Sequence, residues 1–309
     1  MFWAIIGLVF IGLSWTLVGV VLGGAPKKGL QPEIVIFFGA LAPTVISGFL
    51  LWSGAAPAVD WFSKGALLGV LFYSLAAFFN FLMQYFLALT MQHGPNGIIW
   101  SITQSGMLLT FLFGVIFKGD QFTWVRGSGM VLLLIALALL GLARDNQVKS
   151  NQKKWVLGAF LCFVLCGTNQ ILAMIPTYIP EVRDGFNSVA RSFICSIVTV
   201  IAGLLLNVAR QHQKFFVQLG KSCCNKYLWI YTGIQQVFGL VGAYFIHYRC
   251  IDYLSAKGQG AIAYPILVAS CIAGFAFYSV LFLHEKTSLI QKIGILASIV
   301  GVIIISIVH

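Results

Sequence analysis

The central feature of the sequence is residues 93–129, which read HGPNGIIWSITQSGMLLTFLFGVIFKGDQFTWVRGSG. Between Gly97 and Phe117, about twenty residues pass without a charge, and at ~1.5 Å per residue a helix of this length crosses the ~30 Å hydrocarbon core of a bilayer. A Gly-Pro-Asn-Gly turn precedes it, and a Lys-Gly-Asp segment follows it, before another apolar run that contains Gly129. The stretch therefore predicts two membrane-spanning helices with a short connection.

The same pattern returns near the other end of the chain. There, residues 258–260 open an apolar span that ends in Phe-Leu-His-Glu, before the last apolar run. The spacing is 165 residues for three matched pairs: Phe117 and Phe282, Asp120 and Glu285, and Gly129 and Gly294. Self-similarity at half the chain length indicates duplication of a multi-helix unit, as in many carriers. We therefore predict two repeats, residues 1–143 and 155–309, joined by a basic connection at residues 144–154.

Composition places the chain in the polytopic membrane class. Of its 309 residues, 60% are hydrophobic and 9% are charged, and the apolar runs are longer than a soluble core requires. A soluble enzyme is therefore not expected. The net charge of +11 does not predict nucleic acid binding, because Lys and Arg lie in connections between apolar spans rather than on one basic face.

Apolar runs separated by short connections divide the chain into ten spans. They cover residues 2–22, 33–52, 65–90, 97–117, 123–143, 155–176, 188–209, 227–252, 260–283 and 287–308. Because each half has an odd number of spans, the second half enters the membrane in the opposite sense from the first. The predicted fold class is an all-α integral membrane protein with ten transmembrane helices in two inverted five-helix repeats.

The distribution of Lys and Arg predicts the orientation of the chain. Twelve lie in or beside connections that follow odd-numbered spans, and seven lie on the other side. Basic connections remain in the cytoplasm, so this bias places both termini outside. Short connections without sorting tails favour a bacterial inner membrane.

Polar side chains near the middle of spans predict the functional site, because such groups are costly in hydrocarbon unless they face a cavity or a partner. Asn80 with Gln84, and Trp100 with Gln104, are spaced i, i+4, so each pair shares a helix face. The candidate substrate-binding residues are Trp15, Asn80, Gln84, Trp100, Gln104, Asn169, Gln236 and Tyr264. Each amide could instead form an interhelical hydrogen bond worth ~0.6–2 kcal/mol.

The second, fifth and seventh spans have almost nothing polar at mid-depth, and we expect them to lie outside the cavity. All eight Asp and Glu residues fall in connections or at helix ends, so a lipophilic-cation pump would lack its buried carboxylate. A phosphorylated substrate would require a deep Lys or Arg. An amide and aromatic lining without charge suits a neutral, hydroxyl-rich solute, most simply a sugar or polyol.

Three residues near the end of the eighth span are candidates for coupling or gating. His247 is the evident titratable group within the bundle and could carry a coupling proton, although a lone His can also be a packing residue. Arg249 and Asp252, at i, i+3, could gate one mouth of the cavity, but a helix-end ion pair that fixes the helix register is the simpler interpretation. The seven cysteines show no metal-binding spacing, so neither a metal nor a cofactor is expected.

The segments GPNGIIWSITQS (94–105), FKGDQFTWVRGSG (117–129), FLHEKTSLIQKIG (282–294) and YRCIDYLSAKGQGAIAY (248–264) resemble the drug/metabolite transporter superfamily, in particular its EamA-like ten-helix carriers. The long basic connection between the seventh and eighth spans is similar to that of the rhamnose and other sugar porters. The resemblance implies alternating access to a central cavity between two inverted halves. The chain departs from the family pattern at Lys118-Gly119-Asp120 and His284-Glu285, where a Gly-Glu pair is usual.

These observations favour a secondary transporter that moves a small neutral polar metabolite, most simply a sugar or polyol. An exporter of amino acids or related metabolites is the alternative, and a structural membrane protein without transport activity is a third hypothesis. The expected partners are a small-molecule substrate, the lipid bilayer and a coupling proton, with no nucleic acid.

Overall fold

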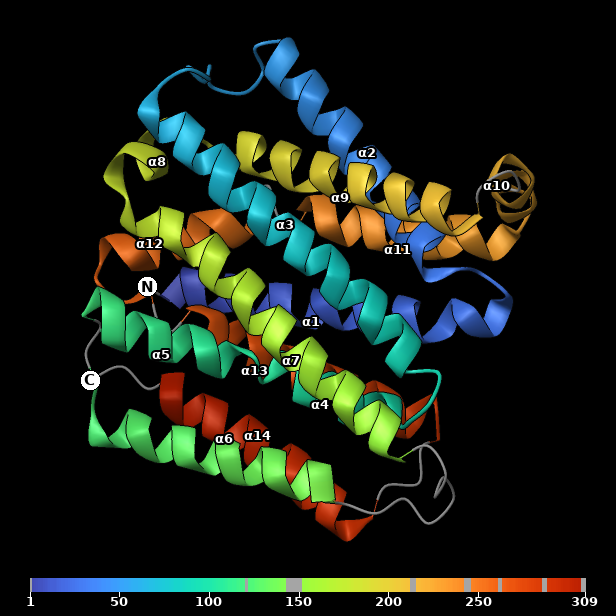
Figure 1. Ribbon diagram of the computed structural model, residues 1–309. Coiled ribbons are helices and arrows are strands. Elements are labelled where there is room, and N and C mark those ends of the chain that lie inside the picture. Colours follow the sequence, from blue (N-terminus) through green and yellow to red (C-terminus); the bar gives the residue numbers. More distant parts are fainter. Residues whose placement is uncertain are drawn as a thin grey trace.

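A computed structural model describes residues 2–119, 122–142, 152–211, 215–241, 246–260, 263–284 and 288–306. Within these ranges the chain forms helices and no β-strand (Figure 1). The helices that form the bundle are α1 (Phe2–Gly24), α2 (Pro32–Trp52), α3 (Lys64–Thr90), α4 (Asn96–Gln104), α5 (Met107–Lys118), α6 (Trp124–Leu142), α7 (Gln152–Met174), α9 (Ser188–Gln211), α11 (Lys226–Val241), α12 (Tyr248–Ala256), α13 (Ala263–Leu281) and α14 (Leu289–Ser306). Short helices connect them: η1 (Pro26–Lys28), η2 (Ile175–Tyr178), α8 (Pro180–Gly185) and α10 (Phe215–Cys223).

Among the described residues, six helical segments are long and apolar enough to cross a membrane: Phe2–Gly24, Pro32–Trp52, Lys64–Thr90, Asn96–Lys118, Lys154–Tyr178 and Ser188–Arg210. Shorter apolar helices follow at Trp124–Ala136, Ala263–Ser279 and Lys292–Gly301. Large apolar side chains such as Phe49, Phe78 and Phe160 are exposed on the outside of the bundle, as lipid-facing positions require. The chain is therefore an all-α, multi-pass membrane protein.

One of the predicted spans is broken in the structure. Span 97–117 divides into α4 and α5 at Ser105 and Gly106, where the backbone changes to i→i+3 hydrogen bonds, such as Gly106 N–H to the Thr103 carbonyl. Gly106 packs against α7 so closely that a Cβ there would overlap the Phe163 carbonyl. Within span 227–252, α11 and α12 lie on either side of residues 242–245, which are outside the described ranges.

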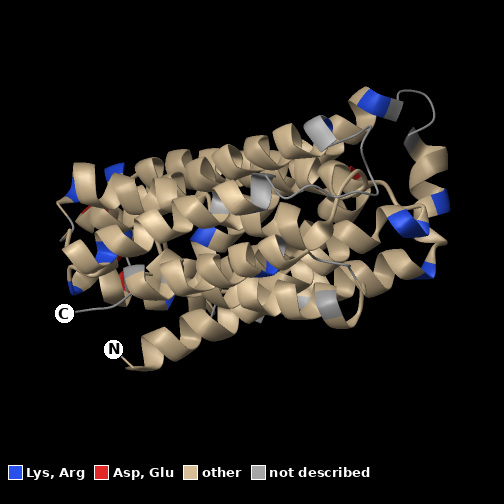
Figure 2. Cartoon of the chain, turned by 90° about the horizontal axis from the view of Figure 1, so that it is seen from below, with Lys and Arg blue, Asp and Glu red and all other residues tan. Residues whose placement is uncertain are grey.

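The helices pack as pairs of distant segments. The α6 helix lies along α14, α2 along α9, α3 along α7 and α1 along α13, with the α6–α14 pair at one edge of the bundle and the α2–α9 pair at the other (Figure 1). The start of α1 and the end of α14 lie at the same end of the bundle, and most Lys and Arg residues lie toward its two ends (Figure 2). Charge is thus concentrated where the bundle meets water, and the middle is left to apolar and uncharged polar groups.

Glycines bring these helices into close contact. A Cβ at Gly12 of α1 would overlap the Leu267 carbonyl of α13, and a Cβ at Gly301 of α14 would press on the Gly129 carbonyl of α6. Lipid is as apolar as the helix surfaces, so close packing through small residues, rather than a hydrophobic driving force, holds such pairs together. These glycine positions determine how near the helices can approach.

We expect Gly12→Ala to destabilise the protein by ~1–3 kcal/mol, because the added methyl group meets a backbone atom that can move only with its helix. Gly233→Ala in α11 is the matched control, since nothing lies within 4 Å of a Cβ there. The control should be neutral or stabilising, because alanine favours the helix by roughly 0.5–1 kcal/mol. Thermal unfolding in detergent measures both, and equal melting temperatures for the two variants would contradict the close contact.

Candidate functional site

A cavity of about 280 Å³ lies in the middle of the bundle, close to the lower end of the ~300–1,000 Å³ of small-molecule pockets. Side chains from α1, α2, α3, α4, α7, α9, α11, α12 and α13 line it. Its polar and aromatic lining comprises Ser14, Trp15, Asn80, Gln84, Trp100, Gln104, Asn169, Gln170, Ser192, Ser196, Thr199, Gln235, His247, Tyr248 and Tyr264. Among the lining residues that the structure describes, there is no Asp, Glu, Lys or Arg. The cavity is uncharged unless its histidine is protonated.

The cavity brings together most of the predicted site residues. Trp15, Asn80, Gln84, Trp100, Gln104, Asn169 and Tyr264 all line it. Gln236 does not: its Nε2 donates to the Phe38 carbonyl of α2 at 2.7 Å, so it joins two helices. Its neighbour Gln235 lines the cavity instead and donates from Nε2 to Gln84 Oε1 at 3.2 Å. The two glutamines serve different purposes because adjacent helical residues point about 100° apart.

Several amides in the cavity have unused hydrogen-bonding capacity. Gln104 Oε1 and Gln235 Oε1 are buried without a hydrogen-bond partner. Asn80 and Asn169 line the cavity, and the described residues offer no hydrogen bond to either side chain. Gln170 differs, because its Oε1 accepts from Thr110 at 3.1 Å and its Nε2 donates to Cys166. Buried polar groups normally find partners, so the free amides mark positions that a polar ligand can satisfy.

Aromatic rings form one wall of the cavity around His247. The Trp15 ring meets the imidazole edge to face at 5.4 Å between centroids, Tyr264 does so at 6.2 Å, and Tyr248 stacks on it at 5.1 Å. The His247 side chain is buried, and its Nε2 has no hydrogen-bond partner. This arrangement places a polar nitrogen within an apolar wall that can cover one face of a ligand.

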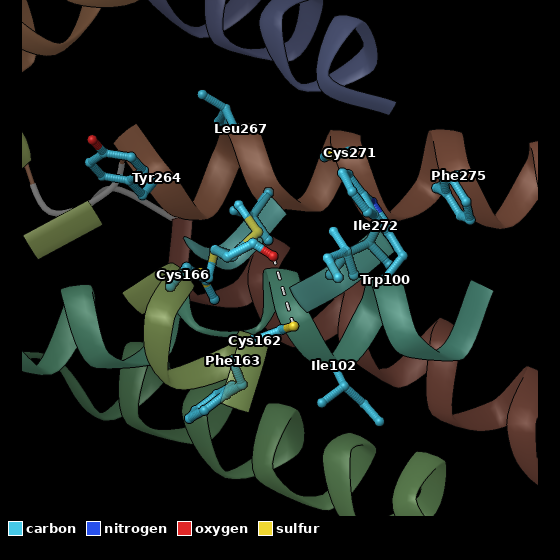
Figure 3. Close-up of a cluster of buried hydrophobic side chains, with 14 of the residues drawn as sticks. Trp100, Ile102, Cys162, Phe163, Cys166, Tyr264, Leu267, Cys271, Ile272 and Phe275 are labelled. Atoms are coloured by element: carbon cyan, nitrogen blue, oxygen red, sulfur yellow. Dashed lines mark hydrogen bonds between the residues drawn. The ribbon is translucent and has the colours of Figure 1, made fainter. Parts of the chain in front are cut away.

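Trp100 contributes mainly to packing. Its ring stacks on Phe275 of α13, with centroids 5.1 Å apart and an interplanar angle of 23° (Figure 3). A Cβ at Gly19 of α1 would overlap both rings, so α1 covers the pair closely. The tryptophan therefore lines the cavity while joining α4 to α13, and its exposed fraction is only 2%.

The predicted ion pair between Arg249 and Asp252 is wrong. Asp252 instead binds Arg191 of α9, whose Nη1 lies 2.8 Å from both carboxylate oxygens. Arg191 is 1% exposed and donates further to the carbonyls of Phe186 and Arg183, whereas Arg249 is exposed. The buried guanidinium is satisfied by these acceptors together. Its negatively charged partner is Asp252, which lies 61 residues away in the chain.

The ion pair of Arg191 and Asp252 lies next to the cavity. Its guanidinium is 5.7 Å from the ring centroid of Tyr73 and 5.6 Å from that of Tyr248, which lines the cavity, and Ser192 beside it is also a lining residue. Neither Arg249 nor Asp252 lines the cavity itself. The Arg191–Asp252 ion pair therefore packs against the aromatic wall without lining the cavity.

The expectation that the second and seventh spans lie outside the cavity is also wrong. Gly39, Ala40 and Pro43 of α2 line it, and α9 contributes Ser192, Cys195, Ser196 and Thr199. The hydroxyls of Ser196 and Thr199 donate to carbonyls of their own helix, so they are satisfied whether they face lipid or a cavity. Their presence in the sequence therefore did not indicate that this helix lines the cavity. Pro43 within an apolar helix was the signal available in the sequence. Within the described ranges, no three His, Cys, Asp or Glu side chains could hold a metal ion.

Comparison with known proteins supports the fold alone. No family model matches the sequence, and no curated relative does. A solved structure described as "Crystal structure of protein" aligns with 96% of this chain and 94% of its own, at 12% identity and a TM-score of 0.55. The fold and cavity together define a multi-pass, all-α membrane protein with an uncharged central pocket.

Replacement of Arg191 by alanine should destabilise the protein by ~3–5 kcal/mol, because it leaves the partly buried carboxylate of Asp252 without its partner. The matched change Arg249→Ala should alter stability by no more than about 0.5 kcal/mol, since that side chain is exposed. Thermal unfolding in detergent compares the two variants. A larger loss for Arg249→Ala would show that the pairing is wrong.

Proposed function

We propose that the protein is a secondary transporter that moves a small neutral polar metabolite, most simply a sugar or polyol, by alternating access. The observation that carries this proposal is the central cavity, whose described lining combines free amides with aromatic rings and has no formal charge. An amide offers a donor and an acceptor together, which suits hydroxyl groups. An aromatic face covers the apolar side of a sugar ring.

The proposed organisation is ten transmembrane helices in two inverted repeats, and the packing supports it. Exchange of the halves would map α1 onto α7, α2 onto α9, α4 and α5 onto α13, and α6 onto α14. The α2–α9 and α6–α14 pairs then map onto themselves, and the α1–α13 contact maps onto the contact of α7 with α4 and α5, which is also present.

Backbone geometry at matched positions is further support for the repeat. Gly119, which ends α5, has a φ of 70°, and His284, which follows α13, has a φ of 50°. The two positions are 165 residues apart, the spacing found in the sequence. A left-handed backbone costs a non-glycine residue about 1–2 kcal/mol. That His284 adopts this conformation in spite of the cost is consistent with α5 and α13 ending in the same way.

The break between α4 and α5 supports alternating access at this site. Carriers place substrate sites where transmembrane helices are interrupted, because irregular backbone is tolerated where it lines a cavity. Gln104, the last residue of α4, lies at the break, and its free Oε1 lies in the cavity wall. A rocking motion of one half against the other would then expose the same amides to each side in turn.

The alternative is an exporter of amino acids or related metabolites. A zwitterion would require a carboxylate and a cation, or equivalent helix ends, in the cavity, and the described lining supplies neither charge. Resemblance to the sugar porters of the drug/metabolite transporter superfamily points the same way as the amides. A bacterial inner membrane with both termini outside remains part of this proposal.

A ligand panel tests the proposal. We expect one neutral sugar or polyol to raise the melting temperature of the detergent-purified protein, because a ligand at 100 times its Kd stabilises the native state by ~2.7 kcal/mol. The variant Gln104→Ala should lose this shift. Amino acids, organic cations and sugar phosphates complete the panel, and uptake of the stabilising solute into proteoliposomes is the confirming measurement.

The matched control is Gln92→Ala, which makes the same change at an exposed position outside the cavity. It should keep the full ligand-induced shift. Stabilisation by amino acids or cations, with no response to neutral sugars, would exclude a neutral substrate and leave the fold intact. Equal losses in both glutamine variants would exclude Gln104 as a binding residue.

A further inference from the structure

Glu33 is a buried carboxyl that is paired on one side only. It lies in the first turn of α2 and is 0% exposed. Its Oε1 accepts from Arg210 Nη1 of α9 at 2.6 Å, but its Oε2 has no hydrogen-bond partner. An unsatisfied oxygen on a buried carboxylate is costly, so this group needs an explanation beyond helix packing.

A second unsatisfied acceptor lies on the facing helix. Asn207 of α9 is 1% exposed, and its Oδ1 has no partner. Its Nδ2 donates to the Gly203 carbonyl at 2.8 Å, which fixes the amide with the oxygen on the other side. Residues 203, 207 and 210 share one face of α9. Gly203 packs against Phe37 and the Glu33 carbonyl, and Arg210 binds Glu33, so Asn207 between them faces the same turn of α2.

The two members of the ion pair differ in their access to water. The Arg210 side chain is 46% exposed and can turn into solvent while it remains charged. Glu33 is fully buried and cannot remain ionised once its partner has left, because an unpaired buried charge is strongly unfavourable. If Arg210 leaves, the buried Glu33 carboxylate must therefore bind another cation. A proton is the cation that suits this position, because it can bind the free Oε2 of Glu33 and be shared with one acceptor, Asn207 Oδ1.

We propose that Glu33 is a proton-binding site that alternates between two partners. In one state the carboxylate is paired with Arg210. In the other, Arg210 lies in solvent, a proton from water is bound to Oε2, and the new O–H donates to Asn207 Oδ1. Arg210 stays protonated throughout, so the cluster gains one positive charge. A single proton satisfies both of the orphaned oxygens.

The charged and titratable groups around this turn, in the described part of the chain, are Arg210 on α9, Tyr85 on α3, Lys28 on η1, and Lys226, Tyr227 and Tyr231 on α11. Arg210 also donates to the Tyr85 hydroxyl at 3.2 Å, and Lys28 lies over the Tyr227 ring. Glu33 is the carboxyl of this group and has the unpartnered oxygen, so the proton is assigned to it.

The location of the site explains how a bound proton would act on transport, a step that rests on the proposed function. The α2 and α9 helices belong to different predicted repeats, pack along each other and both line the cavity. A shift between them would separate Arg210 from Glu33 and reshape the cavity in the same movement. This assigns the coupling proton to the α2–α9 contact rather than to His247.

The experiment uses the full chain in detergent and follows the melting temperature from about pH 5 to pH 8. Arg210→Ala reproduces the state in which the arginine has left. Its folded form should hold a proton that the unfolded chain has released above about pH 5. The variant is then most stable at low pH and loses stability as pH rises. The slope of its free energy of unfolding against pH should correspond to about one more proton bound by the folded state, relative to the unfolded state, than in the wild type. The double variant Arg210→Ala/Glu33→Gln should lose this extra slope and recover its melting temperature at pH 8.

Two further variants sharpen the test. Asn207→Ala in the Arg210→Ala background should lower the melting temperature throughout the pH range, and by more than Asn207→Ala does in the wild type, because the protonated carboxyl loses its acceptor. Arg249→Ala, an exposed arginine elsewhere, should leave the wild-type pH profile unchanged. The proposal is overturned by an Arg210→Ala profile that matches the wild type, or by an extra slope that survives Glu33→Gln and disappears with His247→Gln.

If Arg210→Ala does not fold, infrared difference spectra of the wild type between pH 8 and pH 5 test the same proposal, that Glu33 binds a proton. A buried protonated-carboxyl band that Glu33→Gln lacks supports the site, and an identical band in Glu33→Gln excludes it. Neither readout uses a transported solute. Failure of the sugar panel therefore leaves the proton site standing, and failure here leaves the neutral-substrate proposal standing.

Discussion

A polar group surrounded by lipid must find a partner or face a cavity, and this constraint organises the whole bundle. Helices satisfy the backbone. Hydroxyls such as that of Thr199 bond back to their own helix, and charges such as those of Arg191 and Asp252 pair between helices. Two amides with an unsatisfied oxygen, Gln104 and Gln235, lie in the cavity wall, and a third, Asn207, lies at the α2–α9 contact. The polar groups that folding leaves unsatisfied therefore mark the two sites where a ligand or a proton can bind.

Close helix contacts shape that site. Gly12 lets α1 meet α13, and Gly106 lets α4 and α5 meet α7, so the walls of the cavity approach within backbone distance. Both contacts join the predicted halves of the chain rather than neighbours within one half. A larger side chain at either position would push the walls apart and change the cavity without altering any of its polar residues.

Much of this arrangement was predictable from sequence, for identifiable reasons. Asn80, Gln84 and Gln104 reach the cavity because uninterrupted helices carry i, i+4 residues on one face. Which of Gln235 and Gln236 lines the cavity was not predictable, because the direction of a helix face within α11 is set by its neighbours. The partner of Asp252 was hidden by its distance along the chain. Glu33, at the end of a predicted span, gave no sign that α9 would bury it.

Pro43 gives α2 a mechanical property that its packing alone would not. Because proline has no N–H, the Gly39 carbonyl has no donor four residues later, and the helix lacks one rung at the level of the cavity. Bending at this level costs less than it would in an intact helix, by about the worth of one hydrogen bond, ~0.5–1.5 kcal/mol. The α2 helix is therefore easier to bend at the level of the cavity, where a bound solute would contact it, than an intact helix would be.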